Sequence, residues 1–511
     1  MGESIEKNFN NNGGSLSASF RLSPSKEALK LVPYSAAVRL MMLPLEVTPQ
    51  GRLKVAAVRT DDLPAADEVK ALSGLPVDIF HADAETLTRE IERAYNFHGL
   101  IEQLTSRYAE AASPEKETPE DLSDSAPVVQ IVKSLFQQAV AERCSDIHIE
   151  PTEKDSRVRF RIDGRLAEAV TFPGKLHAAV SARIKILSNI DIAEKRLPQD
   201  GRILSQVCGR KIDFRVSTLP SVHGEKIVIR ILDRQQTVRG LEGLGCDAEG
   251  LESIESLLRL KSGIILAAGP TGSGKTTTLY AMLARLNAAE FNIVTVEDPV
   301  EYEISGTTQV QINEKGGLTF ASVLRSILRQ DPDIIMVGEI RDSETASLAV
   351  RAALTGHLVV SSLHTNDAAS SAIRLVDMGV PPFLAASALK GVVAQRLVRK
   401  LCPHCKEPYT LSDSQCARLG VPEKSTFWRP VGCSKCSGRG YYGRTALFEI
   451  LKISSSFSEA VQGRGSADTL RCEAERSGMK SLSVCGVEKA LAGVTSLEEV
   501  WEVVSAKEDK R

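Results

Sequence analysis

One glycine-rich segment limits the possible folds of this chain more than any other feature. The segment Gly269-Pro-Thr-Gly-Ser-Gly-Lys-Thr276 directly follows the apolar run Ile264–Ala268. Apolar residues then recur at helical spacing: Leu279, Met282, Leu283 and Leu286. A buried strand, a glycine loop and a helix in this order form a phosphate-binding loop, because the backbone N–H groups of the loop and of the helix N-terminus attract a phosphate. The sequence therefore predicts an α/β domain that binds a nucleotide.

The residues of this loop have distinct expected roles toward ATP and Mg²⁺. Lys275 is predicted to bridge the β- and γ-phosphates, and the Thr276 hydroxyl is predicted to ligate Mg²⁺. The expected nucleotide contacts are Gly269, Pro270, Thr271, Gly272, Ser273, Gly274, Lys275, Thr276 and Thr277. We therefore expect ATP and Mg²⁺ as ligands of this loop.

A phosphate loop of this kind also needs a carboxylate at the end of a nearby strand. The segment Asp333–Glu339 is an apolar strand that ends in Glu339. We interpret it as a Walker B strand in which Glu replaces the usual terminal Asp. The alternative is an ordinary surface glutamate after a strand.

A second acidic group follows the apolar strand Ile293–Val296. It consists of Glu297, Asp298 and Glu301. Hydrolysis needs a carboxylate that orients the attacking water and accepts its proton, and each of the three is a candidate for this role. Asp298 could instead cap a helix that begins at Pro299.

Two histidines flank the next apolar strand. His357 precedes it and His364 follows it. Their odd spacing places the two side chains on opposite faces of a strand, so they are not expected to share a metal ion. His364 follows the end of the strand, where a sensor of the γ-phosphate would lie. A purely structural histidine is the alternative at both positions.

Four cysteines form two C-x-x-C pairs. They are Cys402, Cys405, Cys433 and Cys436. Two such pairs complete a tetrahedral set of four thiolates, which suits Zn²⁺, and a closed set of this kind is structural rather than catalytic. Residues 406–432 would form an inserted loop rather than a compact zinc ribbon, and His404 is not expected to be a ligand. A pair of redox-active C-x-x-C motifs is the alternative.

The overall charge and hydropathy exclude some classes of protein. The net charge of -2 and the isoelectric point near 6.5 argue against a general nucleic-acid binder. No stretch approaches the roughly 18 consecutive apolar residues that cross a bilayer. We therefore expect a cytoplasmic protein.

Changes in composition along the chain predict its domains. Residues 1–25 are polar and expected to be disordered, and residues 111–127 are acidic and rich in Pro and Ser, as expected of a linker. The predicted domains are a small mixed domain (26–110) with a hairpin over 43–58, an α+β domain (128–240) and an α/β domain (241–511) that includes the cysteine subdomain (401–437) and C-terminal helices. Thr495-Ser-Leu-Glu498 predicts a capping box before the last helix.

The combination of these segments resembles a known family. In order, the phosphate loop, Val296–Tyr302, Arg329–Asp342 and Thr355–Asp367 are similar to the Walker A, Asp box, Walker B and His box of the type II/type IV secretion ATPase superfamily. Ser145–Pro151 and Phe160–Arg165 resemble the domain that precedes the ATPase core in the same family. The likeness extends over about residues 131–503.

This resemblance implies roles for particular residues. It implies a RecA-like P-loop ATPase core in a hexamer, with the nucleotide site between that core and the preceding α+β domain. Glu339 would lie near Mg²⁺, Glu301 becomes the best candidate to activate water, and His357 and His364 occupy the His-box positions. Two arginines of the preceding domain, Arg215 and Arg230, match those that reach the γ-phosphate; otherwise each is an exposed strand arginine.

The resemblance also implies partners and a type within the family. A tetracysteine subdomain and a separate N-terminal domain are typical of the assembly ATPases for type II secretion or pilus extension, and the modest N-terminal domain favours secretion. The expected partners are inner-membrane platform proteins, which would hold this protein at the membrane periphery. A pilus-extension ATPase is the main alternative. A DNA motor that uses the basic segment Gln395–Lys400 and a non-enzymatic scaffold are the others, and no nucleic acid is expected.

Overall fold

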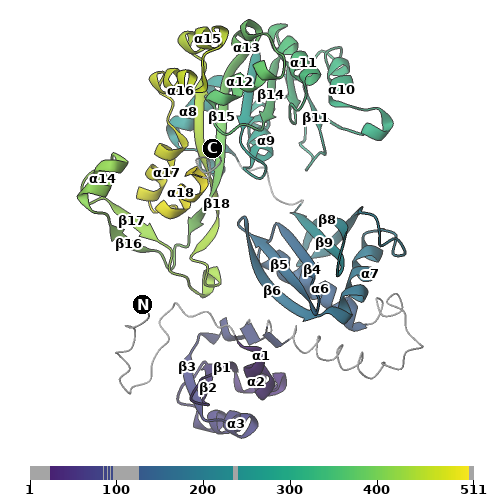
Figure 1. The fold of residues 1–511 in the computed structure, drawn as a ribbon, viewed down its shortest axis with the longest axis vertical. Helices are drawn as coiled ribbons and strands as arrows, with labels where there is room; N and C mark the ends of the chain where they lie inside the picture. The colour runs from purple at the N-terminus through teal and green to yellow at the C-terminus, as the bar shows by residue number, and fades with distance from the viewer. Residues whose placement is uncertain are drawn as a thin grey trace. The chain divides into compact units, whose positions relative to one another are not determined.

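The computed structural model describes residues 24–84, 86–88, 90–91, 94–95, 126–233 and 240–505. Residues 1–23 and most of the predicted linker lie outside these ranges. Internal contacts divide the chain into two compact units: residues 1–235 with 431–440, and residues 236–430 with 441–511. Figure 1 shows the elements of each part. The exact domain boundaries stay a prediction.

The N-terminal region forms a small three-stranded sheet with its own core. Its elements are α1 (Lys26–Leu31), α2 (Tyr34–Leu40), β1 (Met42–Val47), β2 (Leu53–Ala57), α3 (Leu63–Ser73) and β3 (Val77–His81). β1 and β2 form the predicted antiparallel hairpin, and β3 pairs with β2 in parallel. Leu43, Leu53 and Val55 are fully buried, so the apolar residues of the hairpin supply the core of this region.

The second region is an antiparallel sheet covered by helices. Its elements are α6 (Ala126–Ala141), β4 (Asp146–Pro151), β5 (Asp155–Ile162), β6 (Arg165–Pro173), α7 (His177–Leu187), β7 (Gln199–Val207), β8 (Arg210–Ser221) and β9 (Gly224–Asp233). The strand order is β6-β5-β4-β9-β8-β7. The rings of Phe136 on α6 and Phe214 on β8 stack with centroids 4.5 Å apart, which anchors the helix to the sheet. The predicted α+β character of this region is confirmed.

The third region is a seven-stranded sheet in the order β12-β11-β13-β14-β10-β15-β18. The strands are β10 (Gly263–Ala268), β11 (Ile293–Glu297), β12 (Thr308–Gln311), β13 (Ile334–Val337), β14 (Leu358–Leu363), β15 (Leu389–Leu401) and β18 (Tyr441–Lys452). All neighbours pair in parallel except β15 and β18. The carboxyl ends of β10, β11, β13 and β14 therefore meet at one edge of the sheet, where ligands of such sheets bind.

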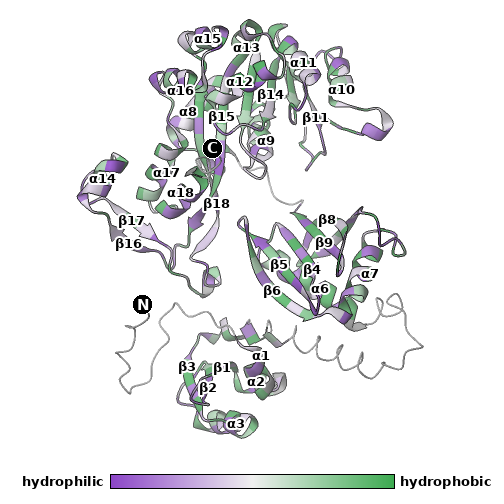
Figure 2. Ribbon diagram, viewed as in Figure 1, coloured by the Kyte–Doolittle hydropathy of each residue, from purple (hydrophilic) through white to green (hydrophobic). Residues whose placement is uncertain are grey.

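Helices cover both faces of this sheet. They are α8 (Ala248–Leu258), α9 (Lys275–Leu286), α10 (Phe320–Ile327), α11 (Ser343–Leu354), α12 (Ala369–Asp377) and α13 (Pro382–Ala388). Ile264 and Leu266 of β10 pack into one core, whereas Ile265 and Ala267 pack into the core on the other face. All six residues of β10 are buried, and Figure 2 shows the hydrophobic character of the central strands. The uninterrupted apolar strands of the sequence are thus explained by burial on both faces.

The segment between β15 and β18 holds the four cysteines, and helices end the described chain. The elements are β16 (Glu407–Thr410), α14 (Asp413–Leu419), β17 (Thr426–Arg429), α15 (Ser455–Gln462), α16 (Ala467–Arg476), α17 (Leu482–Leu491) and α18 (Leu497–Ser505). The predicted cap of α18 is one residue off: Ser496 Oγ accepts the N–H of Glu499, while Thr495 donates to the Arg399 carbonyl. No helix among the described residues is long and apolar enough to cross a membrane.

Candidate active site and metal centre

The phosphate loop connects the carboxyl end of β10 to the start of α9. Gly274 is the N-cap of α9 in the left-handed conformation (φ 91°), and no side chain caps the helix. A side chain at Gly269 would place its Cβ 2.5 Å from Ser273 Oγ and 2.7 Å from the Gln395 carbonyl. Glycine is therefore required for this close turn, and the first N–H groups of α9 are left for a phosphate, as the sequence predicts.

Lys275 is buried against the loop that precedes it. Its Nζ donates to the carbonyls of Gly269 (2.8 Å) and Pro270 (3.1 Å). Burial lowers the pKa of the Lys275 ammonium, and the nearby carboxylate of Glu339 partly offsets this effect. Thr276 and Thr277 lie exposed in the first turn of α9. A phosphate at the helix N-terminus would offer Lys275 a stronger partner than two neutral carbonyls.

Gln395 on β15 forms a hydrogen bond to the phosphate loop and was not predicted as a site residue. Its side-chain amide donates to the Ser273 carbonyl (2.7 Å), and the residue is 1% exposed. This contact fixes the peptide between Ser273 and Gly274. The next residue, Arg396, donates to the backbone carbonyl of Asn366 (2.7 Å), in the loop that follows β14. The predicted basic segment Gln395–Lys400 is thus partly internal rather than an exposed patch.

Glu339 lies just beyond β13 and is joined to His364. Glu339 Oε2 is 3.0 Å from His364 Nε2, and Arg341 forms an ion pair with the other oxygen. Burial raises the pKa of the Glu339 carboxyl, but the hydrogen bonds and charges of Arg341 and His364 outweigh burial and lower it below the usual value. The structure therefore brings together Lys275, Glu339 and His364 from the loops after three neighbouring strands, with Glu339 ionised.

The three acidic candidates after β11 have different surroundings. Glu297 is 2% exposed and accepts hydrogen bonds from Thr295 (2.6 Å), from Gln309 (3.1 Å) and from the hydroxyl of Tyr280. These donors contact both of its oxygens and hold the Glu297 carboxylate in place at this edge of the sheet. No helix begins at Pro299, so the alternative role of Asp298 as a helix cap is wrong.

Glu301 and Asp298 are the more accessible of the three candidates to activate water. Asp298 is exposed and lies 3.7 Å from Arg341. Glu301 is half-buried, and its backbone N–H donates to the Tyr280 hydroxyl (3.2 Å). Because Tyr280 lies on α9, the position of Glu301 is tied to the helix that begins at the phosphate loop. Tyr280 is a second contributor that the sequence analysis missed.

The remaining predicted residues lie elsewhere. His357 is at the amino end of β14, where its Nδ1 is 2.8 Å from the Ala352 carbonyl, so the strand separates it from His364 and the phosphate loop. Arg215 and Arg230 belong to the other unit, where they are directly opposite each other on β8 and β9. Arg230 is exposed and 3.4 Å from Asp146. Their placement against the nucleotide stays a prediction.

The four predicted cysteines form one cluster. The Sγ atoms of Cys402, Cys405, Cys433 and Cys436 all lie within 4.8 Å of one another. Cys436 Sγ accepts the N–H groups of Cys433 (3.2 Å) and Gly440 (3.2 Å), and such bonds stabilise a thiolate. His404 is exposed and outside the group. This donor set fits a tetrahedral zinc ion, and residues 406–432 form a small hairpin with a helix, as expected of an inserted subdomain.

Comparison with known proteins agrees with this architecture. A family model described as Type II/IV secretion system protein matches residues 121–502, and an MshEN domain model matches residues 19–99. Type II secretion system protein E of Dickeya dadantii is 41% identical over 93% of this chain and 97% of its own length. The type IV pilus assembly ATPase PilB of Myxococcus xanthus is 44% identical over 93% of this chain and 86% of its own.

Solved structures extend the comparison to the fold. The pilus retraction motor PilT with bound ADP is 25% identical, covers 74% of this chain and 97% of its own, and has a TM-score of 0.50. The DotB ATPase of Legionella pneumophila, at 20% identity and a TM-score of 0.55, shares the fold. Fold and loop define a P-loop ATPase with a RecA-like core. Within that class, the chain belongs to the type II/IV secretion system protein family and is an enzyme that hydrolyses ATP.

Proposed function

We propose that this chain is the hexameric ATPase that powers type II protein secretion by driving assembly of a pseudopilus at the inner membrane. The observation that carries the proposal is the assembly of Lys275, Glu339 and His364 at one edge of the sheet, in a chain that matches a type II secretion protein E over 97% of that protein's length. The protein would act in the cytoplasm, at the periphery of the inner membrane.

The residues of the phosphate loop and the residues around it would have different roles in binding and hydrolysing ATP. Residues 269–277 would hold the phosphates, with Lys275 turning from the loop carbonyls to the β- and γ-phosphates. Thr276 and Glu339 would hold Mg²⁺, which neutralises charge on the phosphates when bound. Glu301 would accept the proton of the attacking water, and His364 would sense the γ-phosphate from the Glu339 side. His357 would contribute to catalysis indirectly, from the amino end of β14.

The arginines of the second region would make hydrolysis depend on domain placement. Arg215 and Arg230 lie side by side across β8 and β9, so they would approach the γ-phosphate together. An arginine supplied in this way accelerates phosphoryl transfer by about 10³- to 10⁵-fold. Hydrolysis would then proceed only when that region closes on the ATPase core of a subunit, which couples the chemical step to movement.

The other parts of the chain would connect the motor to its partners. The N-terminal region would dock on the cytoplasmic part of an inner-membrane platform protein. The cysteine cluster would bind one Zn²⁺ as a structural centre, since a closed set of four thiolates leaves no position for a substrate.

Substitutions in the site test this function. Glu301→Gln is expected to keep ATP binding and to lower kcat by about 10²- to 10⁴-fold, because it removes only the proton acceptor. Lys275→Ala is expected to abolish both ATP hydrolysis and secretion in cells. Glu303→Gln is the matched control, since Glu303 is exposed near the same loop. Secretion at the normal level in cells that carry the Lys275→Ala protein would refute the proposal.

Pilus extension is the second candidate, because the Myxococcus PilB matches as much of this chain as the Dickeya secretion protein does. Deleting the gene in its own host separates the two. Loss of secreted proteins from the medium with pili retained supports the secretion function, whereas loss of surface pili with secretion retained supports pilus extension.

A further inference from the structure

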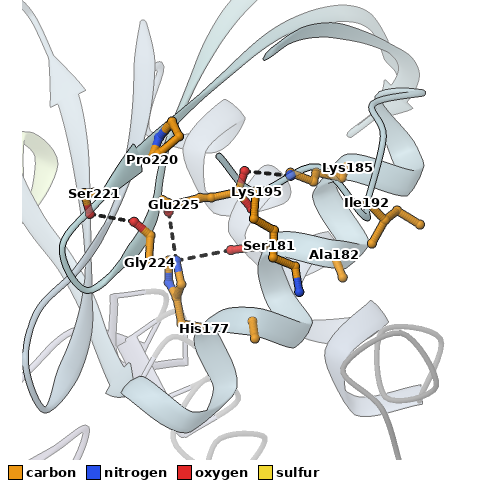
Figure 3. A pocket seen from close by; sticks show the side chains of 11 residues that line it. His177, Ser181, Ala182, Lys185, Ile192, Lys195, Pro220, Ser221, Gly224 and Glu225 are labelled. Carbon is orange, nitrogen blue, oxygen red and sulfur yellow. Dashed lines mark hydrogen bonds and ion pairs between the residues drawn. The ribbon is translucent and has the colours of Figure 1, made fainter. Parts of the chain in front are cut away.

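A cavity of about 150 Å³ lies in the second region, remote in sequence from every predicted site residue except the two arginines. Figure 3 shows it between one face of α7, the loop after α7 and the end of the β8–β9 hairpin. Its polar lining residues are His177, Ser181, Lys185, Lys195, Ser221 and Glu225. Alanines of α7, Ile192 and Pro220 form the apolar part of the wall.

A buried ion pair forms one side of the cavity. Lys185 Nζ is 2.6 Å from Glu225 Oε1, and the side chains are 1% and 9% exposed. Lys185 Nζ also donates to the Glu194 carbonyl (2.7 Å) and is 3.4 Å from the Asp191 carbonyl. The ammonium group therefore has a partner for each of its N–H bonds, and the pair contributes no net charge to the cavity.

His177 determines which groups remain available to a ligand. Its Nε2 is 2.8 Å from the Glu225 backbone carbonyl, which only accepts, so Nε2 carries the proton and Nδ1 accepts from Ser156 (2.9 Å). Burial lowers the pKa of His177, which keeps the ring neutral. Ser181 Oγ, 3.2 Å from the same Nε2, can then only accept from it. Within the described residues, no acceptor is present for the hydroxyl hydrogen of Ser181, which is 4% exposed.

Lys195 gives the lining of the cavity its net positive charge. It is exposed at the mouth of the cavity, and no described residue forms an ion pair or hydrogen bond with its ammonium group. Because Lys185 and Glu225 cancel, the lining carries one net positive charge. The cavity thus combines a cation, a buried hydroxyl donor and apolar walls.

We propose that this cavity binds a small carboxylic acid with a short aliphatic body, whose carboxylate accepts hydrogen bonds from Lys195 and Ser181. A cavity of about 150 Å³ holds a ligand of about the size of benzene, which limits the ligand to about six heavy atoms. The single uncompensated cation, Lys195, balances a monoanion but leaves a dianion such as phosphate only half neutralised, which favours a carboxylate.

The position of the cavity gives the ligand a regulatory effect. It bridges α7 and the hairpin formed by β8 and β9, the two strands that carry Arg215 and Arg230. A ligand that contacts both elements restrains the hairpin. Binding itself does not depend on the proposed secretion function, so the two can fail separately.

Binding is tested on the full chain with butyrate, by saturation-transfer NMR. Butyrate should bind the wild type, and Lys195→Met should weaken binding at least about 10-fold because the only uncompensated cation is lost. Ser181→Ala should weaken it several-fold. Lys211→Met, which removes an exposed positive charge of β8 outside the cavity, should bind like the wild type. No binding to the wild type, equal binding by Lys195→Met, or equal binding of the neutral amide butyramide would overturn the proposal.

Two further measurements test whether butyrate restrains the β8–β9 hairpin from this cavity and whether the cavity prefers a carboxylate to phosphate. At butyrate ten times above its Kd, amide hydrogen exchange in residues 219–226 should slow by up to about 11-fold if the hairpin opens only after release of the ligand. The same slowing in Lys195→Met would show that the effect does not come from this cavity. Inorganic phosphate should not displace butyrate; displacement at lower concentration than that of butyrate would refute the carboxylate class.

Discussion

The contact from Gln395 to the phosphate loop can be tested by removing its amide. Gln395→Leu keeps the volume of the side chain but deletes the 2.7 Å hydrogen bond to the Ser273 carbonyl. A buried hydrogen bond is worth about 1 kcal/mol, and a buried carbonyl left without a donor costs about 1–3 kcal/mol. The loop can escape this cost only by turning the peptide that precedes Gly274. About 1–2 kcal/mol should therefore be lost from nucleotide binding, which raises the Kd by about 5- to 30-fold.

The assay measures affinity and turnover together. Fluorescent ADP titration should show the rise in Kd, and steady-state kinetics should show a higher KM with a smaller change in kcat, because Gln395 positions the loop and does not touch the reacting atoms. Thermal unfolding is measured in parallel. The reasoning is refuted if the Kd for ADP is unchanged in a protein that melts like the wild type, or if kcat falls while the KM stays the same.

Two other predictions concern the cysteine cluster and the second region. Cys436→Ser should lower bound zinc, measured by elemental analysis, from about one ion per chain to a small fraction and expose residues 401–441 to protease, since structural zinc contributes about 10–16 kcal/mol. The control is Cys472→Ser, which replaces an exposed cysteine outside the cluster and should keep its zinc. Full zinc in the Cys436→Ser protein would contradict the assignment. Burial opposes ionisation of Glu150, but the hydrogen bonds and charges of Arg159 and Lys226 outweigh it and lower the pKa to about 2. This folded-state pKa lies below the ordinary value, so the stabilisation is present at pH 7 and disappears as the pH falls from about 4.5 to 2. Glu150→Gln should accordingly be less stable than the wild type at pH 7 in urea unfolding followed on β4 and equal to it near pH 2; a constant difference across this range would exclude the electrostatic cause.

The phosphate loop and the cysteine pairs could be predicted because their chemistry depends on local spacing. Each loop residue lies within a few positions of the next, and the strand and helix beside it have clear apolar patterns. The C-x-x-C pairs are local in the same sense, and only the meeting of the two pairs required the fold.

Gln395 could not be predicted in this way, because β15 reaches the phosphate loop only through its pairing with β10. The signal in the sequence was the polar pair Gln395 and Arg396 inside the otherwise apolar run Val392–Val398, which we interpreted as the start of a basic segment. Tyr280 was hidden for a related reason: its spacing on α9 indicates a core residue, and its hydroxyl meets Glu297 only because β11 lies in the same sheet.

The two histidines show the limit of arguments from periodicity. Their odd spacing predicts that the two side chains lie on opposite faces of a strand, but it does not say at which end of the strand each residue lies. The parallel sheet places the carboxyl end of β14 beside those of β10 and β13, so His364 meets Glu339 while His357 meets the end of α11. The last helix is a smaller example: Thr495 and Ser496 are both good caps, and the carbonyl of Arg399 decides between them by engaging Thr495.

The length of β15 has a consequence for how the nucleotide is felt at a distance. The strand carries Gln395 beneath the phosphate loop and ends at Leu401, one residue before Cys402, and its register with β18 runs from Gly391 to Leu401. The seven residues from Gln395 to Leu401, which are six steps of about 3.3 Å, span about 20 Å of paired, twisted backbone that resists bending. If phosphate release shifts the loop, the paired backbone of β15 would carry that shift toward the cysteine cluster. A partner protein that binds the cysteine cluster would restrain one end of β15. Through Gln395 at the other end, it would also restrain the orientation of the peptide between Ser273 and Gly274 in the phosphate loop.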